Sequence, residues 1–251
     1  MNFHLDKSFE SLRNGILDTI SNFNSFEPAF GTGKRNSIKK IEISGKSLVV
    51  KSFKTPILFN QLIYKYFRKS KAERSFEYAT KLTELGINTP KPIAYIEYFS
   101  IFGMKKSFYI SEFVDYDLTY RELVHQPDYP ENEVIVKEFT KFTYKLHEKG
   151  ILFLDHSPGN TLILKRNGFY DFYLVDLNRM QFGQLSFEKR MNNFSRLTPK
   201  KEMVEIMSET YAKLSGEKVE KVLKNMWFYS QRFQEKFHRK KELKKRFLGK
   251  K

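Results

Sequence analysis

The sequence contains no cysteine, so the chain can form neither disulfide bonds nor thiolate metal sites. Long apolar runs are also missing, since no window approaches the roughly eighteen uncharged apolar residues that a membrane span needs. The N-terminus has no basic segment followed by an apolar one, which excludes the usual secretory signal. We therefore expect a cytoplasmic protein without a membrane span.

Acidic residues are few relative to basic ones, and the imbalance is concentrated at one end. The chain has 29 Asp and Glu against 45 Lys and Arg, which gives a net charge of +16. Residues 236–251 hold nine Lys or Arg and a single acid, Glu242. Such a segment favours polyanions, which include nucleic acid, anionic lipid headgroups and phosphorylated substrates. The alternative is a solvated, partly helical tail that only aids solubility.

Apolar alternation and turn signals predict the order of the structural elements. The chain has 251 residues, of which 40% are hydrophobic, enough for one large domain or two packed lobes. Strand patterns dominate before the acidic turn at residues 115–117, and helical patterns dominate after it, as they do in the first thirty residues. Strands are predicted over residues 38–43, 47–53, 93–98, 107–114, 161–165 and 170–175. Helices are predicted over 58–85, interrupted near 69–71, over 119–123 and 131–148, and from 186 onward, where Thr198-Pro199 is a plausible helix start.

Three polar residues have the spacing of a kinase catalytic loop. Asp155 and Asn160 stand five positions apart in L-D-H-S-P-G-N, and Asp176 follows a predicted hairpin in V-D-L-N-R-M. In kinases, the first Asp accepts the proton of the substrate hydroxyl, the Asn binds metal, and the second Asp binds the magnesium that bridges the phosphates. Chance is the alternative, with Asp155 and Asn160 acting only as turn formers beside Pro158.

Two upstream features agree with that interpretation. Lys51 lies in the predicted strand L-V-V-K-S-F, where its ammonium group could meet the phosphates of ATP. Gly31 and Gly33 belong to a short loop before the first hairpin that could close over phosphates through its backbone amides. Next to Asp155, His156 could touch a substrate phosphate or sugar. His147, near the end of a predicted helix, is better explained as a helix-end hydrogen-bonding residue.

These motifs together resemble the lipopolysaccharide kinase family, which contains the Kdo and heptose kinases of Gram-negative bacteria. The resemblance covers residues 33–182 and includes V-V-K-S-F-K-T-P, L-G-I-N-T-P-K-P-I-A-Y-I-E, L-H-E-K-G-I, D-H-S-P-G-N and V-D-L-N-R-M. It implies an α+β, bilobal protein-kinase-like fold. We expect residues 1–114 to form an N-terminal lobe with an antiparallel sheet and a helix, and residues 115–251 to form a mostly helical C-terminal lobe.

The resemblance also implies a reaction and a place for it. ATP with Mg²⁺ would be the phosphate donor, and a sugar hydroxyl of the lipopolysaccharide core or of Kdo-lipid A would be the acceptor. The protein would be peripheral on the cytoplasmic face of the inner membrane, where the basic segment Lys236–Lys251 would meet anionic lipid.

By the same resemblance, individual residues acquire roles. Asp155 would be the catalytic base, Lys51 would bind the ATP phosphates, and Asn160 and Asp176 would bind metal. The main chain of Glu112 and Val114 would bind the adenine edge. A helix glutamate should pair with Lys51, for which Glu77 is preferred and Glu73 is the alternative.

The sequence departs from the kinase pattern at two positions. Phe153 replaces the histidine usual two residues before the catalytic Asp, and Asn178 replaces the glycine usual two residues after the metal Asp. Two other functions stay open. One is a pseudokinase or basic binding module for anionic lipid or nucleic acid, and the other is a kinase-like enzyme acting on protein or on RNA-associated substrates. Among these partners, nucleic acid is the less favoured.

Overall fold

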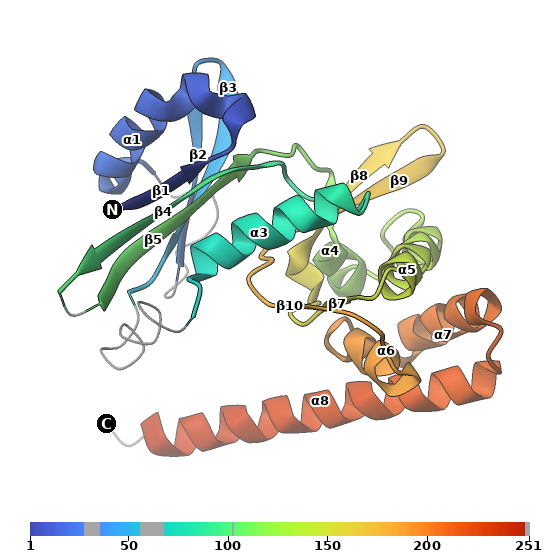
Figure 1. Cartoon of the computed structure of the whole chain (residues 1–251). Coiled ribbons are helices and arrows are strands. Elements are labelled where there is room, and N and C mark those ends of the chain that lie inside the picture. The colour runs from blue at the N-terminus through green and yellow to red at the C-terminus, as the bar shows by residue number, and fades with distance from the viewer. Residues whose placement is uncertain (28–35, 56–67, 102, 249–251) are drawn as a thin grey trace. The chain divides into compact units, whose positions relative to one another are not determined.

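A computed structural model describes residues 1–27, 36–55, 68–101 and 103–248, and the contacts within the chain define two compact units (Figure 1). The first unit comprises Met1–Asp115 together with Asp176–Arg179. The second comprises Tyr116–Val175 and Met180–Lys251. The short segment Asp176–Arg179 thus belongs by its contacts to the first unit, although the residues on both sides of it in sequence belong to the second.

The first unit is built on a five-stranded antiparallel sheet with the strand order β1-β4-β5-β3-β2. The predicted strand pairs are present, and an edge strand at the N-terminus is added to them. β2 and β3 form a hairpin whose turn places Ser44 and Gly45 in the left-handed region. The strands are β1 (Asn2–Leu5), β2 (Asn36–Ile43), β3 (Lys46–Phe53), β4 (Pro92–Ser100) and β5 (Gly103–Glu112).

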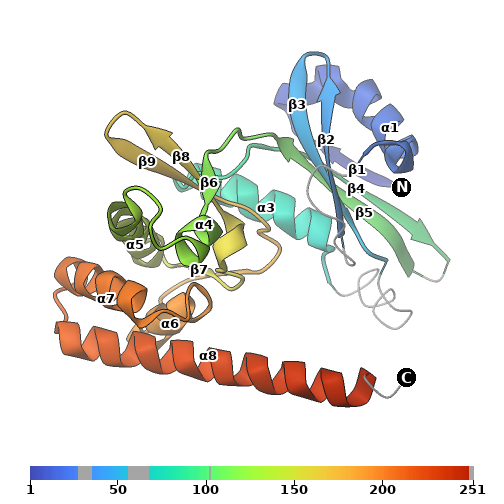
Figure 2. The ribbon, with the colours of Figure 1, turned by 180° about the vertical axis from the view of Figure 1, so that it is seen from behind.

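Helices cover both faces of this sheet (Figures 1 and 2). The 3-10 helix η1 (Lys7–Leu12) and helix α1 (Arg13–Ser21) bury one apolar side against the face that carries Ala94 and Ile96. Side chains alternate along β4, so Tyr95 lies on the opposite face of the sheet from Ala94 and Ile96. On that face the Tyr95 ring packs against the ring of Phe76 in helix α3 (Lys71–Glu84), with ring centres 5.6 Å apart. The sheet is therefore buried on both sides, which fixes the register of β3 and β5.

The second unit is mostly helical and carries two small antiparallel sheets with the strand orders β6-β8-β9 and β10-β7. Its core joins the inner sides of the helices to the β8–β9 hairpin, with Tyr120, Phe139, Ile163, Met207 and Val222 buried together. The elements are β6 (Leu118–Thr119), α4 (Tyr120–His125), α5 (Asn132–Glu148), β7 (Ile151–Phe153), β8 (Thr161–Arg166), β9 (Phe169–Leu174), β10 (Met180–Phe182), α6 (Phe187–Asn193), α7 (Lys201–Ser215) and α8 (Val219–Leu248).

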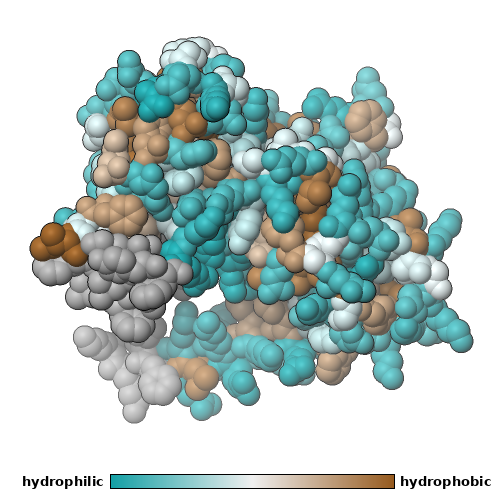
Figure 3. All heavy atoms as spheres, in the orientation of Figure 1, coloured by the Kyte–Doolittle hydropathy of each residue, from teal (hydrophilic) through white to brown (hydrophobic). Residues whose placement is uncertain are grey.

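The C-terminal basic segment belongs to a single long helix, α8, through Leu248. The first half of α8 packs against α6 and α7 of the same unit (Figure 2). Residues 235–246 in its second half are exposed, and in Figure 3 hydrophilic side chains cover most of this part of the helix. In the part of the chain that the structure describes, no helix is both long and apolar enough to cross a membrane.

Gly150 joins α5 to β7 in a backbone conformation that other residues resist. Its φ is +67°, and a Cβ atom there would lie 2.6 Å from the carbonyl oxygen of Gly183. The N–H of Gly183 in turn donates to the carbonyl of Gly150 at 2.9 Å, so the two backbones are held in contact. We expect Gly150→Ala to lower the free energy of unfolding by at least about 2 kcal/mol, because it combines left-handed strain with a backbone clash.

Chemical denaturation measures this effect, and Gly168→Ala is the matched control. Gly168 also has a positive φ, +88°, but a Cβ atom there meets nothing within 4 Å. The control should therefore show only the conformational strain, of about 1 kcal/mol. Equal losses of stability in the two variants would contradict the predicted clash.

Candidate active site

Lys51 and Asp176 are brought together in the first unit. Lys51 lies on β3, in the interior of the sheet, and its side chain is buried. Its Nζ atom is 2.7 Å from Oδ1 of Asp176. The two residues are distant in sequence, so the ion pair results from the fold and not from local structure. Two of the predicted phosphate and metal ligands are therefore neighbours.

Asp176 is held in an unusual backbone conformation. Its φ is +62°, which for a residue with a side chain costs on the order of 1–3 kcal/mol. The same Oδ1 atom that contacts Lys51 also accepts a hydrogen bond of 2.5 Å from Nδ2 of Asn178. Asn178, which stands where kinases usually have glycine, thus fixes the carboxylate of Asp176. The bond joins two side chains, so it differs from the side-chain-to-backbone turn contact that Asn and Asp form at this spacing, and the sequence carried no signal for it.

Asp155 and Asn160 form a second cluster, in the second unit. Asp155 follows β7, and Asn160 ends the 3-10 turn η3 (Pro158–Asn160). Nδ2 of Asn160 donates to the carbonyl oxygen of Asp155 at 2.8 Å, and the carbonyl of Asn160 accepts from the N–H of Val175 at 3.0 Å. The amide nitrogen of Asn160 therefore shapes the loop. Its Oδ1 atom, which is the atom a metal would use, has no partner among the described residues.

Arg196 completes this second cluster. Its guanidinium contacts Oδ1 of Asp155 at 2.6 Å and donates to the carbonyl oxygen of Leu154 at 3.1 Å. The guanidinium carbon lies 5.4 Å from the centre of the Phe233 ring in α8. Because no motif spacing links Arg196 to Asp155, sequence reasoning missed this residue.

The comparisons with known proteins decide the family. A sequence model of the lipopolysaccharide kinase (Kdo/WaaP) family matches residues 30–226, well over half of the chain. The protein belongs to the lipopolysaccharide kinase (Kdo/WaaP) family. The matched range contains Lys51, Asp155, Asn160 and Asp176, and the predicted family is confirmed.

Structural comparison agrees on the fold of this lipopolysaccharide kinase family member. A solved structure of WaaP in complex with acyl carrier protein has a TM-score of 0.62 over 94% of this chain and 99% of that chain, at 16% sequence identity. At this identity the likeness shows the fold alone, and it confirms the predicted α+β, kinase-like class. No curated protein matches the chain by sequence.

A buried network anchors the loop that carries Asp155 in this kinase family member. Nδ2 of Asn193 donates to the carbonyl of Phe153 at 2.7 Å, so its Oδ1 atom accepts from Nε2–H of His147 at 3.1 Å. Nδ1 of His147 then accepts from the hydroxyl of Tyr211 at 3.0 Å. His147 is thus the helix-end hydrogen-bonding residue that the sequence suggested. His156 is fully buried, which excludes contact with a substrate in this conformation.

Both histidines should make stability depend on pH. Burial lowers the pKa of His147 to about 4, against the opposing effect of its bond to Asn193, and burial lowers the pKa of His156 to about 3. In the unfolded chain both imidazoles take up protons below about pH 6.5. Their contribution is therefore complete above pH 6.5 and is lost as the pH falls toward 4, by on the order of 3 kcal/mol for each histidine.

Denaturation at several pH values between 7 and 4 tests this, with His156→Leu as the informative variant. Neither ring nitrogen of His156 has a partner in good hydrogen-bonding geometry among the described residues, and Asn193 is already engaged with Phe153 and His147, so leucine removes a buried polar group at little cost in hydrogen bonding. We expect the variant to lose about half of the pH dependence and to be no less stable at pH 7. His125→Leu, which removes an exposed imidazole, should leave the pH dependence unchanged. A slope unaffected by His156→Leu would show that other groups cause it.

The structure does not bring the predicted helix glutamate to Lys51. Glu77 forms an ion pair with Lys69, and Glu73 lies 3.7 Å from the same ammonium group. Burial and the nearby carboxylate of Glu97 raise the pKa of Glu73. Lys69 stands just before α3 and so reaches the two acids, which lie one helical turn apart.

The remaining predicted residues concern nucleotide binding. The N–H of Glu112 donates to the carbonyl of Lys91 at 2.9 Å, and that of Phe113 donates to the carbonyl of Ser47 at 2.9 Å. Among the described residues, no hydrogen bond to the backbone of Val114 is found. Gly31 and Gly33 lie outside the described residues.

Proposed function

We propose that this protein transfers the γ-phosphate of ATP, with Mg²⁺, to a sugar hydroxyl of the lipopolysaccharide core or of Kdo-lipid A. The observation that carries the proposal is the ion pair of Lys51 with Asp176, because it joins the two charges that a nucleotide–metal complex requires. Membership of a kinase family supports the reaction class, and the acceptor is the finer part of the proposal.

In this proposal Asp155 accepts the proton of the acceptor hydroxyl. Phosphoryl transfer needs little covalent help from a protein, so the orientation of the hydroxyl is the main contribution of such a base. Asp155 suits this role because its carboxylate is held at one oxygen by Arg196 and its backbone carbonyl is held by Asn160. Lys51 would neutralise phosphate charge, and the backbone of Glu112 and Val114 would bind adenine.

The residues proposed for metal binding offer the ligand atoms that Mg²⁺ prefers. Asp176 presents a carboxylate, and Asn160 presents an amide oxygen with its nitrogen already engaged. Mg²⁺ is usually held by one or two such oxygens together with the substrate phosphates. When bound, the ion would neutralise charge on the transferred phosphoryl group.

We also propose that the basic segment Lys236–Lys251 brings the protein to the anionic cytoplasmic surface of the inner membrane. Its described basic side chains are exposed, and each would contribute on the order of 1 kcal/mol near such a surface. A chain that ends before Lys236 should no longer sediment with vesicles containing anionic lipid. Unchanged sedimentation would contradict a membrane role for this segment.

Transfer of labelled γ-phosphate tests the function directly. Mg-ATP would be offered with Kdo-lipid A, heptosylated core oligosaccharide, protein and RNA in parallel, using wild-type protein and Asp176→Ala. Label that enters a glycolipid, and is lost in the variant, is the expected result and identifies the acceptor. Label in protein or RNA would overturn the proposed acceptor, and the absence of transfer to every acceptor by folded protein would favour the binding module.

A further inference from the structure

One face of α8 changes from buried to exposed along the helix. Residues spaced three and four apart share a helix face, so Met226, Ser230, Phe233, Phe237 and Lys240 form one stripe, which Lys244 continues. Met226 and Ser230 are buried in the core of the second unit, Phe233 is half-buried, and Phe237 is 54% exposed. The stripe that anchors the helix therefore continues into solvent as an aromatic and basic surface.

This stripe is connected to the catalytic loop within the second unit. Arg196 contacts the carboxylate of Asp155 at 2.6 Å and lies over the ring of Phe233 at 5.4 Å. Phe233 stacks with Phe237, one turn further along α8, with ring centres 6.4 Å apart. Phe233 alone therefore lies between the exposed Phe237 and Arg196, the residue that contacts Asp155.

Charges on the exposed half of α8 are sorted by face. The side that continues the stripe, which we call the α8 docking face, consists of Lys236, Phe237, Lys240, Lys241 and Lys244. It carries four positive charges and no negative charge, and all five side chains are exposed.

The opposite side of the same helix has a balanced charge. It carries Glu235, Arg239, Glu242 and Arg246, again at spacings of three and four. Glu242 is 3.4 Å from Lys245, so part of the basic charge is also neutralised by an ion pair there. A tail that serves solubility alone has no physical reason to separate its charges in this way, whereas a surface that binds an anion does.

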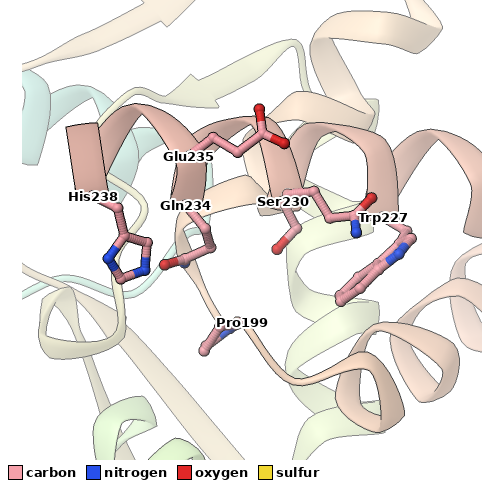
Figure 4. Close-up of a pocket in the computed structure, with 7 residues that line it drawn as sticks. Pro199, Trp227, Ser230, Gln234, Glu235 and His238 are labelled. Atoms are coloured by element: carbon pink, nitrogen blue, oxygen red, sulfur yellow. The ribbon is translucent and has the colours of Figure 1, made fainter.

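A cavity adjoins the docking face. It has a volume of about 470 Å³ and is lined by α8 and Pro199. In Figure 4, the side chains of Trp227, Gln234 and His238 point to the side of the helix where Pro199 lies. Glu235 also belongs to the lining, although its carboxylate points to the other side of the helix in this view. An indole ring, an amide and an imidazole can pack on and hydrogen-bond a sugar ring. Lys241 of the docking face follows His238 by three residues, so the cavity and the basic surface are continuous along the helix.

We propose that the docking face and this cavity bind the acidic saccharide part of the acceptor. The lysines would pair with its carboxylate or phosphate groups, and the cavity would take a neutral part of the sugar. This inference rests on the proposed function and adds to it the place at which the acceptor is recognised.

Binding of a saccharide suits this surface better than insertion into a lipid bilayer does, whereas electrostatic attraction to an anionic membrane surface needs no apolar face. A helix that lies in a membrane interface keeps an apolar face separate from its basic face. Here Lys240 and Lys244 occupy the same stripe as Phe233 and Phe237, so the described side chains of this stripe mix apolar and basic groups and do not form a separate apolar face. Mixed aromatic and cationic side chains suit a hydrated, polyanionic ligand.

Two charge-reversal variants with the same net charge test the proposal. Lys240→Glu with Lys244→Glu alters the docking face, and Arg239→Glu with Arg246→Glu alters the opposite face of the same turns. Binding of deacylated Kdo-lipid A, a water-soluble polyanionic saccharide, would be measured by calorimetry without ATP. We expect the docking-face variant to raise Kd at least about tenfold, which is ~1.4 kcal/mol, and the opposite-face variant to change it less than about threefold. Where turnover is measured, KM for the saccharide should rise while KM for ATP stays unchanged.

Each other outcome decides against the inference. Equal weakening by both variants would show that only net charge matters, and an unchanged Kd in the docking-face variant would show that this face does not bind the saccharide. Absence of saccharide binding to the wild-type protein would also show that this face does not bind the saccharide. The same conclusion would follow if the docking-face variant no longer sedimented with anionic vesicles while its Kd for the saccharide stayed unchanged. Binding as expected without phosphate transfer to any acceptor would support the inference and overturn the proposed function, so the two failures are distinguishable.

Discussion

Replacing Asp155 by asparagine should lower kcat for phosphate transfer to the glycolipid by about 10² to 10⁴-fold, the usual contribution of a general base. Asparagine has nearly the same shape, and its side-chain oxygen can still accept from Arg196, but it cannot take up the proton of the hydroxyl. The backbone carbonyl that accepts from Asn160 is unaffected by the substitution. The loop should therefore stay folded while the chemistry is lost.

The measurement is single-turnover transfer of labelled γ-phosphate, together with the affinity for ATP. Asp128→Asn makes the same chemical change at an exposed position of the second unit and should leave the rate unchanged. An unaltered affinity for ATP in Asp155→Asn would show that the effect lies in the chemical step. Retention of more than about a tenth of the wild-type rate would mean that Asp155 is not the base.

The sequence was most informative where function depends on local spacing. The interval from Asp155 to Asn160 and the β8–β9 hairpin that follows are short-range features, and the structure shows the loop and the hairpin at those residues. Strand β3 around Lys51 was likewise predictable, because its apolar run follows a turn signal and the alternating strand β2.

Residues that act through tertiary contacts could not be found in this way. Arg196 reaches Asp155 from a 3-10 turn that follows α6, and Asn193 reaches Phe153 from the end of α6 itself. Both contacts depend on how the helices pack, for which a single sequence carries no signal. The edge strand β1 was missed for a different reason, because its four residues are too few to show alternation.

The partner of Lys51 illustrates the same limit. Helix register relative to a strand is set by packing, so the sequence could indicate that Glu73 and Glu77 share a face without indicating which cation they would meet. In the structure, Glu73 and Glu77 both form ion pairs with Lys69, and Lys51 forms an ion pair with Asp176. Our proposal for nucleotide binding therefore depends on Asp176 rather than on Glu77.

A double-mutant cycle on Lys51 and Asp176 should show that the two residues act as one unit. We expect Lys51→Met and Asp176→Asn each to lower kcat/KM for ATP by about 10² to 10³-fold, the effect of removing one preorganised electrostatic contact. The double variant should lose little more than either single variant, because residues that act together are not additive. A loss of kcat/KM in the double variant equal to the product of the two single losses would show that each residue contributes independently.

Stability measured on the same four proteins separates the structural contribution of the ion pair from the catalytic one. Lys51 is nearly buried, whereas the side chain of Asp176 is 33% exposed, so solvent screens the pair and its coupling energy in unfolding should be only about 1 kcal/mol. Met can occupy the buried space of the Lys51 side chain, and Asn178 can still hold the residue at position 176. A catalytic loss much larger than this coupling energy is therefore expected of charges that act on bound phosphate. Comparable losses in stability and in catalysis would instead mean that the pair serves mainly to fold the first unit.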